Sequence, residues 1–160
     1  METTELKIIG SVEWCAFDQL KIPAIKARID SGAKTSSIQA TDIELITNDG
    51  EPWVRFVVYP LQKNTLLKTK CIAKLVDKRS IKGSFGISEE RLIIKVPVTI
   101  GEDTFDIELS LANRNTMEFR MLLGREAISN RYLINPAKKH LQKKYSKKEV
   151  IAIYKPKVKD

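Results

Sequence analysis

The sequence predicts a mainly β protein that folds as a barrel or a sandwich. Short apolar or alternating segments follow one another as far as residue 123, and each is bounded by turn residues, as half-buried strands are. Only two segments beyond residue 123 have helical character. The chain has 160 residues, of which 42% are hydrophobic and 30% charged, so it is long enough to build one domain around a hydrophobic core.

Turn residues separate the expected strands. Gly10 is a candidate bend in the first apolar segment, and Pro23 lies near the start of the second, where a strand tolerates proline. NDGE (48–51) and GED (101–103) are expected to form hairpin turns. MLL (121–123) is short and wholly apolar, so we expect it to be buried. The expected strands cover residues 6–17, 22–29, 38–46, 53–60, 68–76, 91–100, 104–111 and 121–123.

One short helix is expected. The segment GREAISN (124–130) is long enough for about two helical turns. The lysine-rich segment 138–154 places Leu141 and Tyr145 on one helical face, which is too weak a pattern to predict a second helix.

The net charge of +8 is concentrated at the C-terminal end. Residues 136–160 contain nine lysines and two acidic residues, so residues 1–135 are nearly neutral. We therefore expect a barrel domain, residues 1–135, followed by a basic lysine-rich tail, residues 136–160. The tail either binds nucleic acid or another polyanion electrostatically, or is a solvated chain end. Its aromatic residues, Tyr145 and Tyr154, are too few for a base-stacking platform.

Composition also indicates a compartment. No apolar run approaches the roughly 20 residues of a membrane span, and the first residues lack the basic and long apolar regions of a secretory signal. Cys15 and Cys71 do not form a disulfide framework. We expect reduced thiols in a cytoplasmic protein.

The residue types needed for most metal or nucleophile chemistry are missing. The single histidine, His140, lies in the basic tail, and the two cysteines are far apart, so a zinc site or a Ser-His-Asp triad is not expected. GSFG (83–86) lacks the Gly-Lys-Ser/Thr ending of a nucleotide-binding loop. A magnesium or calcium site made only of carboxylates stays open, but no matching spacing occurs, and we expect no metal and no cofactor. The remaining candidate catalyst is a carboxylate.

Asp30 is the best placed of the carboxylates. It directly follows the apolar segment 22–29 and precedes Ser31 and Gly32. The glycine allows a tight turn and a close approach to a ligand or a second chain, and the serine hydroxyl can bond locally or across an interface. Taken alone, Asp-Ser-Gly favours an ordinary junction between a strand and a turn.

A second motif changes this interpretation, because the two together resemble the retropepsin-like aspartic proteases. Subunits of that family carry Asp-Thr/Ser-Gly-Ala after an early strand, and later apolar residues followed by Gly-Arg at the start of a short helix. The corresponding segments here are DSGA (30–33) and MLLGR (121–125). Residues 8–135 are most similar to a bacterial branch labelled ATP-dependent zinc proteases and associated with glutamate-adding ATP-grasp ligases. The matching segments are DSGAKTSSI (30–38), RSIKGSFGISEER (79–91) and SLANRNTMEFRMLLGREAI (110–128).

The resemblance implies a small closed barrel of the acid-protease type with one short helix. Asp30 would be the catalytic carboxylate, Ser31 would contact the facing loop through its hydroxyl, and Gly32 would occupy the close-approach position. Gly124 would let the apolar strand pass behind the Asp30 loop. The supporting loop residues would be Ala33, Thr35, Gly124 and Arg125. The tip of a flap over the substrate would comprise Gly83, Ser84, Phe85 and Gly86.

The implied mechanism requires a homodimer. Aspartic proteolysis uses two carboxylates that share one proton, and this chain has one Asp-Ser-Gly motif and is too short for two lobes, so the second Asp30 must come from another copy. The substrate would be a peptide or protein. Two departures limit the resemblance: the zinc and ATP of the branch label find no ligand set or nucleotide loop here, and Asn135 replaces the usual acidic residue before a proline.

Two alternatives stay open. The chain could be an inactive barrel of this type that binds peptides or an acidic polymer such as poly-glutamate, attracted by the basic tail. It could instead be a nucleic-acid-binding β barrel that uses the tail.

Overall fold

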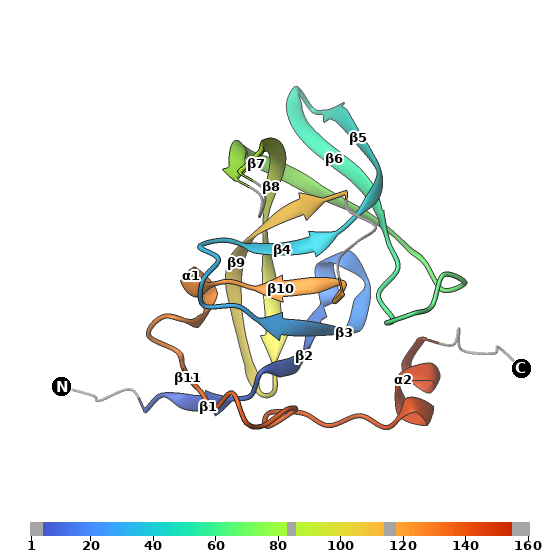
Figure 1. Cartoon of the computed structure of the whole chain (residues 1–160). Coiled ribbons are helices and arrows are strands. Elements are labelled where there is room, and N and C mark those ends of the chain that lie inside the picture. The colour runs from blue at the N-terminus through green and yellow to red at the C-terminus, as the bar shows by residue number, and fades with distance from the viewer. Residues whose placement is uncertain (1–4, 83–85, 114–117, 155–160) are drawn as a thin grey trace, which may run out of the picture.

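The computed structural model describes residues 5–82, 86–113 and 118–154, and six of its strands close into a barrel (Figure 1). These strands are β2 (Val12–Phe17), β3 (Ile22–Ile29), β4 (Ser36–Gln39), β8 (Ser88–Ile100), β9 (Asp103–Ala112) and β10 (Met121–Leu123). Neighbours follow the order β2, β3, β10, β4, β9, β8, and β8 closes the ring by pairing with β2 at Thr99 and Ala16. The predicted closed β barrel is confirmed.

Three further strands extend the sheet beyond the barrel. They are β5 (Thr41–Asn48), β6 (Glu51–Val58) and β7 (Thr69–Lys82), and they continue from β8 in the order β7, β6, β5. Figure 1 shows β5 and β6 projecting from the barrel. Residues 38–46 were expected to form one strand, but β4 ends at Gln39 and β5 begins at Thr41, and the pairing of β5 with β6 is irregular around Asp42, which has a φ of 52°. The strand is therefore divided between the barrel and the extension.

The predicted turn at 48–51 joins β5 to β6. Asp49 and Gly50 both have positive φ, 53° and 77°, which is the geometry that a two-residue hairpin turn requires. Asp and Gly adopt this conformation at low energetic cost, so the residues of the turn are enough to account for its geometry.

The short strand β10 lies at the centre of the fold. It pairs in parallel with β3 and antiparallel with β4, so it is enclosed on both edges. Met121 and Leu123 are fully buried and pack in the main hydrophobic core, as expected for a wholly apolar strand. Within the described residues, no helix has the length and apolar character needed to cross a membrane.

The helices differ in number from the prediction. The expected helix is α1 (Arg125–Ile128), and a second helix, α2 (Lys147–Tyr154), forms in the lysine-rich segment. The described residues also contain a 3₁₀ turn, η1 (Asp18–Leu20). At the start of α2, the Glu149 N–H donates to the Ser146 hydroxyl at 3.1 Å and the Ser146 N–H donates to the Glu149 carboxylate at 3.2 Å. The two residues form a Ser-x-x-Glu capping box, a motif that can be recognised in the sequence.

The segment after Asn135 is attached to the barrel by one buried carboxylate. Glu13 of β2 is fully buried, and it accepts hydrogen bonds from the N–H groups of Gly10 at 2.7 Å, Leu141 at 2.9 Å and Gln142 at 3.1 Å. Next to it, β1 (Lys7–Ile9) pairs in parallel with β11 (Tyr132–Ile134). Gly10, the predicted bend, separates β1 from β2 where the segment crosses, and a Cβ there would lie 2.7 Å from the Lys138 carbonyl carbon.

Aromatic packing fixes the remainder of this segment. Trp14 is buried, stacks on His140 with ring centroids 5.9 Å apart, and meets Tyr145 edge-on at 5.4 Å. The Tyr154 hydroxyl at the end of α2 donates to the carbonyl of Ala24 in β3 and accepts from its N–H. Residues 136–154 therefore pack on the barrel, and the division into a domain and a tail at residue 135 stays a prediction.

We predict that Glu13→Gln destabilises the fold, because the amide replaces one carboxylate oxygen with an NH₂ group that faces backbone donors. The expected loss is about 2–3 kcal/mol of the free energy of unfolding, measured by urea denaturation at neutral pH. Glu102→Gln, in an exposed turn, is the matched control and should leave the stability unchanged. Equal stability of the two variants would mean that the Glu13 hydrogen bonds add nothing to the fold.

We also predict that acid weakens the fold through His140. Burial, reinforced by Lys26, Lys139 and Lys144 and opposed by Glu13, lowers the pKa of this imidazole below its ordinary value. The unfolded chain therefore binds the proton more readily, so stability should fall as the pH drops through about 6.5 and stop falling below the folded pKa.

The test compares the unfolding free energy of the wild type and His140→Asn between about pH 5 and pH 7.5. Asparagine tolerates the positive φ of 54° at this position, and His140 is the single histidine, so the variant removes that titration cleanly. An unchanged pH dependence in the variant would contradict the prediction.

Candidate active site around the Asp30 loop

Asp30 begins the loop that connects β3 to β4. Its N–H donates to the Leu123 carbonyl at 2.9 Å, which continues the pairing of β3 with β10 by one residue. Its own carbonyl accepts from the Ala33 N–H at 3.3 Å, and its carboxylate accepts from the Gly32 N–H at 3.1 Å. The backbone of Asp30 is therefore held by the barrel, and the side chain is oriented by the loop.

The Asp30 carboxylate has few bonding partners among the described residues. It is half-buried, and within the described part of the chain it forms no ion pair. A carboxylate that served only to stabilise the fold would be expected to pair with a cation or to cap several backbone donors, as Glu13 does. Among the described residues, the Asp30 carboxylate accepts one hydrogen bond instead, from the Gly32 N–H.

Gly124 passes directly behind this loop. A Cβ at this position would lie 2.7 Å from the carbonyl carbon of Thr35, 2.9 Å from the carbonyl oxygen of Ala33 and 2.9 Å from the nitrogen of Ser36. These are all backbone atoms, so a side chain at 124 could be accommodated only by moving the loop. Gly124 thus packs against the backbone of Ala33, Thr35 and Ser36, and the supporting roles implied for Ala33, Thr35, Gly124 and Arg125 stay predictions.

The loop also caps α1. The N–H groups of Arg125 and Glu126 donate to the carbonyls of Ala33 at 2.7 Å and Lys34 at 3.1 Å. A helix leaves its first N–H groups without partners inside the helix, and here the Asp30 loop provides the acceptors. The Arg125 guanidinium adds a hydrogen bond to the Ser31 carbonyl at 3.2 Å.

Ser36 is a supporting residue that the motifs did not single out. It is buried, and its hydroxyl accepts from the Gly124 N–H at 2.9 Å. The only signal in the sequence was the run of hydroxyl residues Thr35, Ser36 and Ser37 after the Asp-Ser-Gly motif. That run does not tell which hydroxyl turns inward.

Two predicted positions are left exposed on the protomer. Ser31 and Gly32 face solvent, and a Cβ at Gly32 would meet only the Asp30 carboxylate, at 3.3 Å. The backbone of Gly32 does not have a positive φ. Nothing within one protomer requires glycine there, so the contacts predicted for Ser31 and Gly32 across a facing loop stay predictions.

The flap prediction falls mostly outside the described residues. Gly83, Ser84 and Phe85 are not described, whereas Gly86 has a φ of 77° just before β8. The strands on either side, β7 and β8, pair as far as Lys82 with Ser88.

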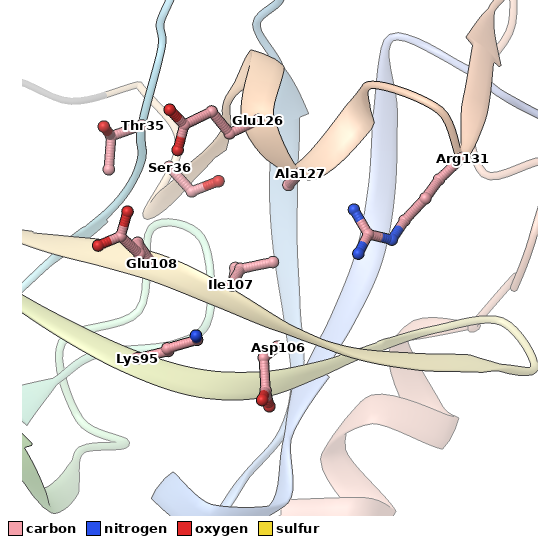
Figure 2. Close-up of a pocket in the computed structure, with 9 residues that line it drawn as sticks. All are labelled: Thr35, Ser36, Lys95, Asp106, Ile107, Glu108, Glu126, Ala127 and Arg131. Atoms are coloured by element: carbon pink, nitrogen blue, oxygen red, sulfur yellow. The ribbon is translucent and has the colours of Figure 1, made fainter.

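A pocket of about 210 Å³ adjoins the other side of the loop (Figure 2). Thr35 and Ser36 line it together with α1 and the strands β8 and β9, and Asp30 is not part of its wall. Figure 2 shows that the carboxylates of Asp106, Glu108 and Glu126 point in different directions. Among the described residues, no three His, Cys, Asp or Glu side chains are placed to hold a metal ion.

The two thiols lie away from this chemistry. Cys15 and Cys71 are both buried and unpaired, as expected from the sequence. Burial raises the pKa of Cys71 to about 12 and raises the pKa of Cys15 further, with a contribution from Glu13, so neither is a ready nucleophile.

Comparison with protein families and curated proteins gives related chains. A family model named RimB-like, described as retropepsin-like aspartic endopeptidase RimB, matches residues 8–145. A protein from Desulfotalea psychrophila named probable alpha-L-glutamate ligase is 51% identical over 152 residues, which are 89% of this chain and 33% of that protein. A protein of the same name from Shewanella pealeana is 51% identical over 130 residues, 81% of this chain and 28% of that protein.

This chain thus spans about a third of the length of the curated relatives that it matches. Among solved structures, a protein of unknown function (DUF785) from Legionella pneumophila has a similar fold, with a TM-score of 0.71 and 27% sequence identity. The similarity covers 87% of this chain and 100% of the Legionella chain.

We predict that Gly124→Ala destabilises the protein by about 1–3 kcal/mol, because the added methyl group displaces the backbone of the Asp30 loop. Gly32→Ala is the matched control, since its methyl group would meet no backbone atom and only one side-chain oxygen, of Asp30 at 3.3 Å, and should leave the stability of the protomer within about 0.5 kcal/mol. Thermal and urea unfolding measure both effects. Destabilisation of the two variants by the same amount would contradict this assignment.

Proposed function

Because the chain belongs to the RimB-like family of retropepsin-like aspartic endopeptidases, we propose that it hydrolyses peptide bonds with water activated between two Asp30 carboxylates, one from each of two copies. The family membership agrees with the resemblance drawn from DSGA (30–33) and MLLGR (121–125). The observation that carries the proposal is the Asp30 loop itself, which is fixed by β10 and α1 and presents a carboxylate without an ion-pair partner.

The rigidity of this loop supports a catalytic use. Aspartic proteolysis requires the two carboxyl groups to be held within hydrogen-bonding distance of one water molecule, and errors of about 1 Å cost rate steeply. Backbone hydrogen bonds from Asp30 to Leu123 and from Arg125 to Ala33 anchor the loop on both sides. A second copy placed across a two-fold axis would bring an equally rigid loop to face the first.

The proposed reaction follows from placing two such groups together. Carboxyl groups about 3 Å apart cannot both ionise, a known property of aspartic proteases as a class, so one Asp30 is protonated and the other is charged. The charged carboxylate takes a proton from water as the water oxygen bonds to the peptide carbon, and the protonated one donates to the carbonyl oxygen. Proton transfer to the peptide nitrogen then lets the carbon–nitrogen bond break, which leaves a carboxylic acid and an amine.

The exposed residues of the loop fit the need for a second chain. We place Ser31 and Gly32 at the interface of the two loops, because both are exposed and Gly32 has space for a close neighbour. The hairpin of β7 and β8 would cover the substrate with residues 83–86. A cytoplasmic location stays a prediction, as does the poly-glutamate attraction of the lysine-rich segment.

A second candidate function is peptide binding without hydrolysis in association with glutamate ligation. The observation that favours it is the name of the curated relatives, probable alpha-L-glutamate ligase, of which this chain spans about a third. The space between the facing Asp30 loops of two copies would then hold a glutamate-containing peptide without cleaving it. The nucleic-acid alternative has less support, because Tyr145 and Tyr154 are engaged in packing against the barrel.

We predict that Asp30→Asn abolishes peptide hydrolysis and leaves the stability nearly unchanged, since the asparagine oxygen can still accept from the Gly32 N–H. Activity is measured by mass spectrometry on a peptide library that includes glutamate-rich sequences, and stability by thermal unfolding. Intact hydrolysis by the variant would overturn the mechanism, whereas loss of folding would assign Asp30 a structural role.

The requirement for two copies is tested by mixing. In wild-type protein unfolded and refolded with an excess of the Asp30→Asn variant, activity should fall with the square of the wild-type fraction, because a mixed pair holds one carboxylate. Sedimentation velocity at the assay concentration reports the dimer. A linear fall in activity, or an active monomer, would contradict the shared site.

A further inference from the structure

A groove unrelated to the Asp30 loop lies between the barrel and α2. It has a volume of about 710 Å³, and most of its lining surface is apolar. Its apolar lining, called its floor below, consists of the side chains of Trp14, Leu61, Phe119, Tyr145, Val150 and Ile151. Ile151 is 50% exposed, so apolar surface is available to a ligand.

Both walls of this groove are held in place. On one side, the Gln62 amide donates to the Glu118 carbonyl at 2.7 Å and accepts from the Arg120 N–H at 3.0 Å, which ties the loop after β6 to the segment before β10. On the other side, α2 is fixed by its capping box and by the Tyr154 hydroxyl on Ala24. A preformed groove binds with a smaller entropic cost than one that must be assembled.

The charge of the groove is one-sided. Three lysines line it, Lys26, Lys63 and Lys147, and no acidic residue among those that the structure describes does. The carboxylate of Glu118 beside it is occupied by Arg28 at 3.4 Å. An apolar floor with a rim of cations fits an anionic ligand that also carries a large apolar group.

We propose that this groove is a docking site for an acidic peptide segment that carries a large apolar side chain, separate from the Asp30 loop. The apolar side chain occupies the floor beside Ile151, and the flanking carboxylates face the three lysines. Lys26 lies in β3 four residues before Asp30, and none of the residues of the Asp30 loop, 30–35, lines the groove.

An acidic peptide fits better than single-stranded nucleic acid. Binding of unpaired bases relies on aromatic faces on which the bases stack. The Trp14 ring is buried against His140 and has the Lys26 ammonium 5.3 Å from its centroid, and Tyr145 meets Trp14 edge-on and has Lys143 over its ring at the same distance. These contacts occupy part of both rings, so the two rings are a poor platform for stacked bases.

The test uses the full chain with Asp30→Asn, so that binding is measured without hydrolysis and its outcome is independent of the proposed function. The probe is a fluorescent synthetic peptide with one phenylalanine flanked by glutamates, and the readout is fluorescence anisotropy. Lys63→Glu, Lys147→Glu and Ile151→Ser should each raise the dissociation constant of the probe about tenfold. Binding should also weaken as salt is raised. Glutamate at 147 is compatible with the first turn of α2, so this variant remains informative if another fails to fold.

Lys78→Glu, on the β7 part of the extension, is the matched control for net charge and should leave the dissociation constant unchanged. A probe with glutamates alone should bind at least about tenfold more weakly than the probe with phenylalanine. Equal binding of the two probes, or equal weakening by Lys78→Glu, would overturn the proposal. Tighter binding of a single-stranded oligonucleotide that is lost with Lys63→Glu would assign the groove to nucleic acid instead.

Discussion

The close contact between Gly124 and the Asp30 loop is the constraint on which the site depends. Strand β10 enters the barrel between β3 and β4, and the chain must then leave it behind the backbone of residues 33–36. There is no space for a side chain at that point. The same contact lets the loop carbonyls accept hydrogen bonds from the first turn of α1. The position of the Asp30 carboxylate is therefore set by backbone packing that few sequence changes could preserve.

A second constraint acts on β2, where Glu13 pairs with Ala27 of β3. Glu13 is a charged group in the interior, and a buried charge is stable only when its oxygens receive hydrogen bonds. The three donors come from Gly10 and from the segment after Asn135, so this segment completes the burial of Glu13. The same segment covers Trp14 and positions α2, which forms one wall of the apolar groove. A part of the chain that is rich in lysine is thereby joined to the core by an acidic residue.

Two surfaces of the protomer thus differ in what they need. The Asp30 loop is held by backbone hydrogen bonds and presents one half-buried carboxylate, and the proposed chemistry begins only when a second copy adds another. The groove between β3 and α2 is complete within one chain, and its three lysines are the chemical basis of the proposed acidic ligand. If both proposals hold, a peptide could be held in the groove while the reaction takes place at the Asp30 loop.

The sequence by itself determined the features that are encoded over a few residues. The strand β10 followed from a wholly apolar triplet, and the hairpin turn from Asp49 and Gly50. Two short motifs and their resemblance to a known family selected Asp30 and Gly124 as candidate site residues. The capping box of α2 is also encoded locally, but it lies in a lysine-rich segment whose weak helical pattern did not predict the helix.

The tertiary structure alone decided what depends on contacts between distant residues. It selected Ser36 among three adjacent hydroxyl residues, divided one expected strand between β4 and β5, and buried Glu13 beneath residues more than a hundred positions away. None of these outcomes has a local signal. Each one arises because a buried hydrogen-bonding group must find its partner wherever the folded chain places one.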